Sequence, residues 1–512
     1  ETSLGRVGAE MCIRDRVTAL SLLLWAAITR SSNHWTSIFI AVTGNITAFA
    51  LLFLRTPPSD TAVQIFADQL VVDGYSTFFR ALFLIIASLT IVLGAQRFNS
   101  APITEFAVLI EFSLLGMMLL VGSIDWSTAF IAIETMAIPV YVLAGITRFR
   151  RASLEAAMKY FALGAFASAV LVYGIAWTYG LTGTTNLLTT AEVLADRGNE
   201  PWVLFALALI LVALGFKVAA VPFHAWTPDA YQGAPTPAAA FISVGPKVAA
   251  MALLARVVTT AFEPLAANAS FTLAIIAAAT MIIGNLVAIS QTDLKRMLGY
   301  SSIAHTGYLL VGIASISQTE SVTTFVGIPA VLFYGFVYAF MTFGAFAVAY
   351  VAETQTGSNE ISALHGMSRR AMLPAIAMAI FMLSLTGVPP LSGFVGKLYL
   401  LQAAVDANLG WLAIVLVGTS VVSAFYYLRV VVAMFMEDSV ATIDDTQPKP
   451  AAADSHVLVI TIAAGLTVLF GIVGWGLLDW AQTAVSSSPV SYTHLRAHET
   501  EADLVCRLLL EK

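Results

Sequence analysis

Four ionisable residues lie inside long apolar stretches of this sequence, where a charge is costly. They occur in AFIAIETMAIPVYVLAG, ALGFKVAAVPFHAW, ISVGPKVAAMALLA and PPLSGFVGKLYLLQ, and they are Glu134, Lys217, Lys247 and Lys397. A charge at mid-bilayer costs ~2.5–3.5 kcal/mol on insertion scales, and residues that bear this cost usually line a pathway or pair inside a bundle. Moving one charge changes the proton affinity of its neighbour, as a proton relay requires. The four residues therefore predict a proton path.

Each of these residues also has a purely structural interpretation. The glutamate would then be a neutral acid held by a hydrogen bond between helices, and each lysine would extend its side chain to the membrane interface. Glu134 lies well inside its apolar stretch, and three separate lysines lie deep in theirs. We therefore interpret all four as members of the relay.

Two further residues are weaker candidates for the same path. His305, in YSSIAHTGYLL, is either a neutral relay group or a core histidine with satisfied hydrogen bonds. Lys295 borders the membrane, so that an interfacial role and a relay role are equally open. Glu111 is an additional buried carboxylate for which the sequence offers no interpretation, and Asp73 is expected to anchor the start of a helix.

The composition requires that these residues sit in a membrane protein. Of the 512 residues, 59% are hydrophobic and 11% charged, against roughly 45–50% and about 25% in soluble domains. Apolar runs of helical length recur along the chain, whereas the alternating segments of a β-barrel are absent. The expected fold is an all-α polytopic membrane protein of about fourteen spans. They lie near 17–29, 36–54, 77–96, 103–122, 126–147, 157–180, 202–221, 237–260, 269–290, 300–316, 323–352, 372–404, 409–435 and 455–480.

Two spans carry clusters of helix breakers close to a buried lysine. VPFHAWTPDAYQGAPTP follows Lys217 at the end of span seven, and TGVPPLSGFVGK precedes and includes Lys397 in span twelve. A plain proline kink would account for one such cluster. Two clusters at corresponding places favour a transport site built from repeats. We therefore expect spans 4–8 and 9–13 to be inverted repeats, with helices seven and twelve discontinuous.

The ends of the chain differ from the rest. Residues 1–16 and 489–512 resemble translated sequencing adapters and are expected to be non-native, leaving one transmembrane domain over 17–488. The only cysteines, Cys12 and Cys506, fall in these end segments. Basic residues follow the odd-numbered spans, which places both natural termini on the outer side. His224 and Asp229 are expected on an inner loop near the mouth of the path.

Motifs for chemistry on a substrate are absent. The sequence contains no GxxxxGK[ST], no CxxC and no HExxH, and its basic residues are scattered rather than gathered into a nucleic-acid surface. We therefore expect neither a bound cofactor nor a metal in this chain, and no nucleic-acid partner.

Long segments of the chain resemble a known family. ALGFKVAAVPFHAWTPDAYQGAPTPAAAFIS and QTDLKRMLGYSSIAHTGY are similar to two signatures of the antiporter-like membrane subunits of NADH-quinone oxidoreductase, respiratory complex I. EAAMKYFALGAFASAVLVYG and VDGYSTFFRALFLIIASL resemble the subunit N branch in particular. Subunit M usually has glutamate where this chain has Lys397, and subunit L has a long lateral helix at its C-terminus.

The resemblance implies a proton-translocating subunit in the membrane arm of a bacterial enzyme. In that family a glutamate on helix five and lysines on helices seven, eight and twelve carry protons, and Glu134, Lys217, Lys247 and Lys397 fall on those positions. Flavin, iron–sulfur clusters and quinone reduction belong to other subunits. The implied partners are subunits M, K, J, A and H and the lipid of the cytoplasmic membrane.

Two other functions remain open at this point. One is a subunit of a multi-subunit cation/proton antiporter or of a membrane-bound hydrogenase-type complex. The other is a scaffold that holds a membrane arm together without moving protons.

Overall fold

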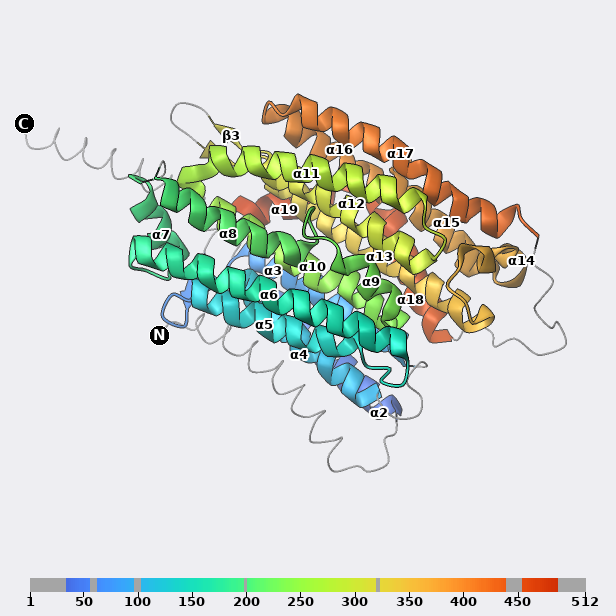
Figure 1. Ribbon diagram of the computed structural model, residues 1–512. Helices are drawn as coiled ribbons and strands as arrows, with labels where there is room; N and C mark the ends of the chain where they lie inside the picture. The colour runs from blue at the N-terminus through green and yellow to red at the C-terminus, as the bar shows by residue number, and fades with distance from the viewer. Residues whose placement is uncertain are drawn as a thin grey trace, which may run out of the picture.

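The computed structural model describes residues 34–55, 62–95, 103–197, 200–318, 323–438 and 454–486. These residues form a bundle of long helices that run roughly alongside one another (Figure 1). Eleven of the described helices are long and apolar enough to cross a membrane. The predicted first span, 17–29, and the two predicted end segments with their cysteines lie outside the described residues. The all-α membrane fold is confirmed.

The helices follow the predicted spans closely. The first half contains α2 His34–Arg55, α3 Gly74–Gly94, α4 Ile103–Gly122, α5 Trp126–Ala144, α6 Arg151–Thr182, α7 Leu187–Leu194, α8 Pro201–Val218, α9 Trp226–Gly233 and α10 Thr236–Thr259. The second half contains η1 Glu263–Leu265, α11 Ala266–Ile289, α12 Leu294–Ala314, α13 Ile328–Thr356, η2 Ile361–Leu364, α14 Met367–Arg370, α15 Met372–Thr386, α16 Ser392–Asp406, α17 Gly410–Phe435, α18 Asp454–Ile472 and α19 Trp475–Ser486.

The structure adds local detail that the span lengths did not predict. The last predicted span, 455–480, consists of α18 and α19 with a break between them. Glycine lowers helix propensity, and GIVGWG supplies three glycines at this break. Two antiparallel hairpins also occur in loops: β1 Val63–Ile65 with β2 Leu70–Val72, and β3 Ser317–Gln318 with β4 Thr323–Thr324.

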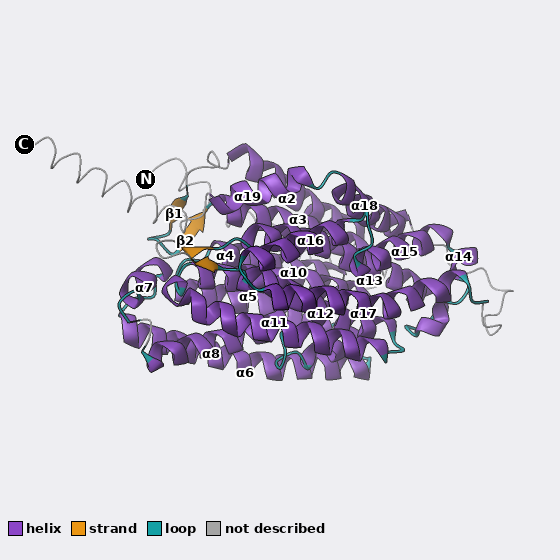
Figure 2. Cartoon of the chain, turned by 90° about the horizontal axis from the view of Figure 1, so that it is seen from above, coloured by secondary structure: helices purple, strands orange, loops and turns teal. Residues whose placement is uncertain are grey.

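Helices α10 and α13 occupy the interior of the bundle. The membrane-length window of each is completely buried, whereas no more than a third of that window is buried in α2, α6 and α18. Seen from above, the labels of α10 and α13 lie among those of the other helices, and β1 and β2 lie at one end (Figure 2). A helix that is apolar on all sides needs such a central place. Lys247 lies on α10, so its position is remote from lipid.

Helices α4 to α10 and α11 to α17 repeat the same packing. Gly116 on α4 lies so close to α5 that an added Cβ would be 2.3 Å from the Met136 backbone nitrogen. Gly284 on α11 lies equally close to α12, where a Cβ would be 2.6 Å from the Ala304 nitrogen. In each set the third helix packs on both parts of a discontinuous helix: α6 on α8 and α9, and α13 on α15 and α16.

The turns of the two sets also match. Helix α6 ends at Gly183 with φ 72°, and α13 ends at Gly357 with φ 71°. In each set the segment after this turn is hydrogen-bonded to the start of an earlier helix. Trp126 N donates to Thr185 O, and Leu294 N donates to Asn359 O, each at 2.8 Å. Helix α7, which follows the first turn, and α14, which follows the second, lie at opposite ends of the bundle in Figure 1. The corresponding turns of the two sets thus lie at opposite ends of the bundle, as inverted repeats require.

Both predicted helix breaks are confirmed. Helix α8 ends at Val218, where Ala219 turns the chain with φ 63°, and α9 resumes at Trp226. Helix α15 ends at Thr386, where Gly387 has φ 95°, and α16 resumes at Ser392. Each break exposes the carbonyl groups of a helix end inside the bundle, and these groups need hydrogen-bond donors.

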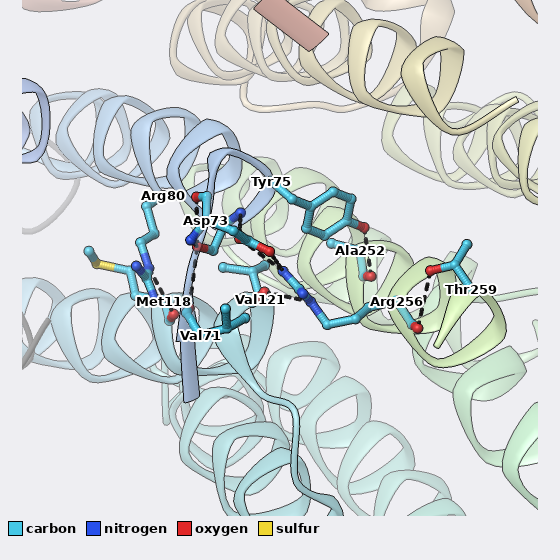
Figure 3. Close-up of polar contacts among 10 residues, drawn as sticks. Val71, Asp73, Tyr75, Arg80, Met118, Val121, Ala252, Arg256 and Thr259 are labelled. Atoms are coloured by element: carbon cyan, nitrogen blue, oxygen red, sulfur yellow. Dashed lines mark hydrogen bonds and ion pairs between the residues drawn. The ribbon is translucent and has the colours of Figure 1, made fainter. Parts of the chain in front are cut away.

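A buried cluster of charged residues joins α3, α4 and α10 at the hairpin end of the bundle (Figure 3). Asp73 caps the start of α3, as predicted, by accepting from Ser76 N. The Arg256 guanidinium donates to Asp73 Oδ2 at 3.0 Å and to the Val121 carbonyl at 3.1 Å. Arg80 donates to the Met118 carbonyl at 3.3 Å. The two arginines thus satisfy carbonyls in the last turn of α4.

The glycine contacts predict that close helix packing within each repeat contributes to the stability of the chain. We expect Gly116→Ala or Gly284→Ala to destabilise the chain by about 1–3 kcal/mol, because the added methyl group collides with backbone. The measurement is the thermal unfolding midpoint in detergent. Gly180→Ala is the control, since a Cβ there meets nothing within 4 Å. A Gly116 variant as stable as the Gly180 variant would contradict the packing argument.

Removing the buried arginine should be more costly than removing an exposed one. Arg256→Met leaves the buried Asp73 carboxylate without its cationic partner, and breaking a buried pair in this way costs about 3–5 kcal/mol. Arg369→Gln removes an exposed pair with Asp438 and should cost ~1 kcal/mol or less. Unfolding midpoints that fall equally in the two variants would show that Arg256 has no special role in stability.

Candidate functional site

Two of the predicted relay residues, Glu134 and Lys217, lie close together in a cluster formed by three helices. Lys217 Nζ on α8 lies 3.7 Å from Glu134 Oε1 on α5. Between them, Lys217 Nζ donates to Ser168 Oγ at 3.2 Å, and Ser168 Oγ donates to Glu134 Oε1 at 2.5 Å. Lys217 also donates to the Tyr141 hydroxyl at 3.3 Å. The serine hydroxyl accepts from the lysine while donating to the carboxylate, so it forms a hydrogen-bonded bridge between the two ionisable side chains.

The sequence reasoning did not identify Ser168 or Tyr141. Gly164 lies one turn before Ser168 on α6, and a Cβ at Gly164 would be only 2.1 Å from the Tyr141 hydroxyl oxygen. The missing side chain lets Tyr141 reach α6 beside Ser168. A glycine and a serine four apart on one helix face were the available signal, but that spacing is too common to identify a site on its own.

Lys247 is held in a second cluster, between α10 and α12. Its Nζ donates to Ser302 Oγ in a short contact and to the Ser302 carbonyl at 3.2 Å. The Ser302 hydroxyl lies 2.7 Å from the Tyr338 hydroxyl on α13. Thr306 Oγ1 donates to the carbonyls of both Ser302 and Val218. Polar contacts therefore connect the Lys247 cluster to the end of α8, next to Lys217.

His305 lies further along α12 among tyrosines. Its Nδ1 is 2.7 Å from the Tyr334 hydroxyl, and its Nε2 is 3.0 Å from the Tyr427 hydroxyl. Both ring nitrogens thus have partners, as a core histidine requires. The partners are hydroxyl groups, which can donate and accept in turn, so the arrangement also suits a neutral relay group.

Lys397 lies at the second helix break. Its Nζ, on α16, donates to the carbonyls of Leu385 and Thr386 at 2.9 and 3.0 Å. These are the last carbonyls of α15, so the lysine caps the negative end of a helix dipole. Its ammonium also lies 4.6 Å from the centre of the Tyr308 ring, a cation–π contact. The lysine is buried at this break.

The remaining candidates have different surroundings. Lys295 is buried in the first turn of α12, and its Nζ donates at 2.8 Å to the Ala234 carbonyl between α9 and α10. Glu111 is buried where α4 meets α2, and it accepts from Asn45 Nδ2 at 3.0 Å. Lys159 pairs with Glu155, four residues earlier on α6, and also with Asp229. Among the described residues, no group of three or more His, Cys, Asp or Glu could hold a metal ion.

Comparison with known proteins now decides the family. Residues 123–423 match the model of the NADH:quinone oxidoreductase/Mrp antiporter transmembrane family. NADH-quinone oxidoreductase subunit N from Desulforamulus reducens is 41% identical over 426 residues, which are 81% of this chain and 85% of that protein. Its counterpart from Chloroherpeton thalassium is 39% identical over 92% of this chain and 96% of that protein. The chain belongs to the subunit N family of NADH-quinone oxidoreductase.

Solved structures agree with this assignment. A chain of respiratory complex I from Thermus thermophilus superimposes with a TM-score of 0.77 at 32% identity, covering 92% of this chain and 98% of that one. A chain of the Mrp complex from Dietzia superimposes with a TM-score of 0.82 at 22% identity, covering 95% of this chain and 98% of that one. The second likeness concerns the fold alone. The family and the fold together support a proton-translocating membrane subunit that assembles with other membrane subunits of complex I.

Proposed function

We propose that this chain carries protons through the membrane arm of a bacterial NADH-quinone oxidoreductase. The relay we propose consists of Glu134, Lys217, Lys247 and Lys397, with His305 and Lys295 as further candidate members. The observation that carries the proposal is the bridge in which Ser168 joins the Lys217 ammonium to the Glu134 carboxylate. A hydroxyl between a donor and an acceptor can pass a proton by exchanging one bond for the other.

The spacing of the clusters supports a stepwise path. Thr306 connects the Lys247 cluster to Val218, next to Lys217, and the Tyr308 ring contacts both His305 and the Lys397 ammonium. Direct hydrogen bonds join the groups within each cluster, and we place water between the clusters. Each lysine in turn would raise or lower the proton affinity of the next by gaining or losing its charge.

Lys295 enters the proposal for a different reason from the others. Its Nζ hydrogen bond to the Ala234 carbonyl joins α12 to the link between α9 and α10. Loss of that proton would weaken a contact between the two repeats. Lys247 also joins the repeats, through Ser302, but there the partner includes a hydroxyl that can pass a proton on, whereas the Ala234 carbonyl cannot. Lys295 is therefore the least direct member of the proposed relay.

A neighbouring subunit should cover the face that carries Glu134. The Glu134 side chain is 27% exposed in the isolated chain, and it lies mid-helix on α5. Ile131 and Ile138, one turn to either side, are exposed as well. A carboxylate facing hydrocarbon is costly. We therefore propose that this face adjoins a membrane subunit of the complex, among the proposed partners M, K, J, A and H.

The energy for transport would come from outside this chain. We propose that flavin and iron–sulfur clusters in other subunits carry the electrons and that quinone reduction occurs there, so that the enzyme is a translocase only as a complex. We place the chain in the bacterial cytoplasmic membrane with its natural termini on the outer side. The exposed residues Arg148, Arg150 and Arg151, after α5, support this orientation.

A cation/proton antiporter without a redox partner is the second candidate function. The fold of the Mrp complex chain favours it, but that chain is 22% identical, against 32% for the respiratory complex I chain. A membrane scaffold is the third candidate, and a scaffold would have no use for the Ser168 bridge.

Neutralising Lys217 tests the relay. We expect Lys217→Met to lower NADH-driven proton translocation by the assembled complex about 10²-fold, since removing a positioned proton-transfer group has roughly this effect. Ser168→Ala should slow it several-fold by breaking the bridge. Proton uptake and electron transfer are measured together in closed membrane vesicles. Ser88→Ala is the matched control, because the Ser88 hydroxyl donates only to a carbonyl of its own helix. Assembled Lys217→Met complex with the full proton-to-electron ratio would refute the relay and favour a scaffold.

A further inference from the structure

The short helix α9, which resumes the chain after the first break, carries a carboxylate that pairs with cations on two other helices. Asp229 on α9 receives a cation from each repeat. Lys159 Nζ on α6 lies 2.9 Å from Asp229 Oδ2, and Arg296 Nη1 on α12 lies 2.6 Å from Oδ1. Arg296 also donates to Gln232, one turn further along α9, at 3.1 Å. Asp229 therefore links α9 to both halves of the molecule, and Gln232 adds to the link with α12.

A series of aromatic contacts connects α9 to Lys217. Trp226, one turn before Asp229, stacks on Tyr160 with ring centres 4.1 Å apart and planes at 2°. Tyr160 in turn meets Tyr141 edge to face at 4.7 Å. The hydroxyl of Tyr141 accepts from Lys217. Lys159 and Tyr160, which are adjacent on α6, thus both contact the same turn of α9. Tyr160 also contacts Tyr141, the partner of Lys217.

The surroundings keep Asp229 charged. The residue borders a polar hollow of about 340 Å³, which Arg150, Glu155, Gln232 and Asp293 also line. Partial burial raises the pKa of Asp229, but hydrogen bonds from Arg296 and Lys159 outweigh this and hold the pKa below its usual value. A carboxyl group with a lowered pKa stabilises the fold above its unfolded-state pKa and loses that effect only as the pH falls through the folded-state value. The attachment is therefore intact at neutral pH.

We propose that Asp229 is a positioning residue that clamps α9 between the two repeats and so keeps Tyr141 and Lys217 in the geometry for proton transfer. This inference rests on the proposed function of Lys217. An isolated exposed ion pair would contribute little. Here two cations from different helices converge on one partly buried carboxylate. Without it, Lys159 and Arg296 would repel each other across α9.

The test compares substitutions of two carboxylates that pair with the same lysine, Lys159. We expect Asp229→Asn to slow NADH-driven proton translocation by the assembled complex about tenfold. Loss of the clamp would shift Tyr141 and Lys217, and small displacements of reacting groups lower the rate strongly. Asp229→Glu should keep at least half of the rate. Glu155→Gln is the control: Glu155 pairs with the same Lys159 at 2.9 Å but does not hold α9, and it should remain within about twofold of the parent.

A double variant separates positioning from general stability. If Asp229 acts through Tyr141, the loss in Asp229→Asn combined with Tyr141→Phe should be no greater than the larger single loss. Should Asp229→Asn fail to assemble, Lys159→Gln serves the same test, because Asp229 then keeps Arg296. A parent-like Asp229→Asn, or single effects that multiply in the double variant, would overturn the inference. Lys217→Met is measured in parallel: if it is inactive, such a result concerns Asp229 alone, and if it is parent-like, the proposed function itself has failed.

Discussion

The ammonium group of a lysine inside an apolar bundle needs oxygen atoms within hydrogen-bond distance, and much of this structure follows from that need. Lys217, Lys247 and Lys397 each meet it differently. Lys217 has hydroxyls and a carboxylate, Lys247 has one serine that offers both its hydroxyl and its carbonyl, and Lys397 has the last carbonyls of a helix. Without such partners, a buried charge would be neutralised or expelled to the interface.

The helix breaks are one way of supplying this oxygen. In a continuous helix each carbonyl already accepts a backbone hydrogen bond, whereas the last carbonyls of a broken helix lack that partner. Ending α15 at Thr386 frees two carbonyls in the interior, and Gly387 allows the turn because its left-handed conformation suits glycine. The same glycine lies next to Lys397, where a Cβ would be 3.2 Å from the lysine Cδ. The break and the buried lysine therefore depend on each other.

The sequence predicted the features that depend on rare residue types or on the length of apolar segments. Charges are rare in apolar stretches, so Glu134, Lys217, Lys247 and Lys397 were visible, and helix-length apolar runs located the spans. Hydroxyl residues are common in membrane helices, so Ser168 and Ser302 could not be distinguished before the helices were placed side by side. The role of Asp229 depends on α6, α9 and α12 meeting at one point, and Lys159 and Arg296 are far from it in sequence. The repeats were predicted from two breaker clusters, but their matching glycine contacts required coordinates.

The two repeats share a framework without sharing a site. Lys217 lies before the break of its helix, and Lys397 lies after the break of its own. The carboxylate of Glu134, next to Lys217, can itself take up a proton, whereas the carbonyl groups that hold Lys397 cannot. The first site can therefore change its charge at either partner, and the second only at the lysine. Repeated backbone geometry thus gives two positions of similar shape whose responses to protons differ because of the side chains placed around each break.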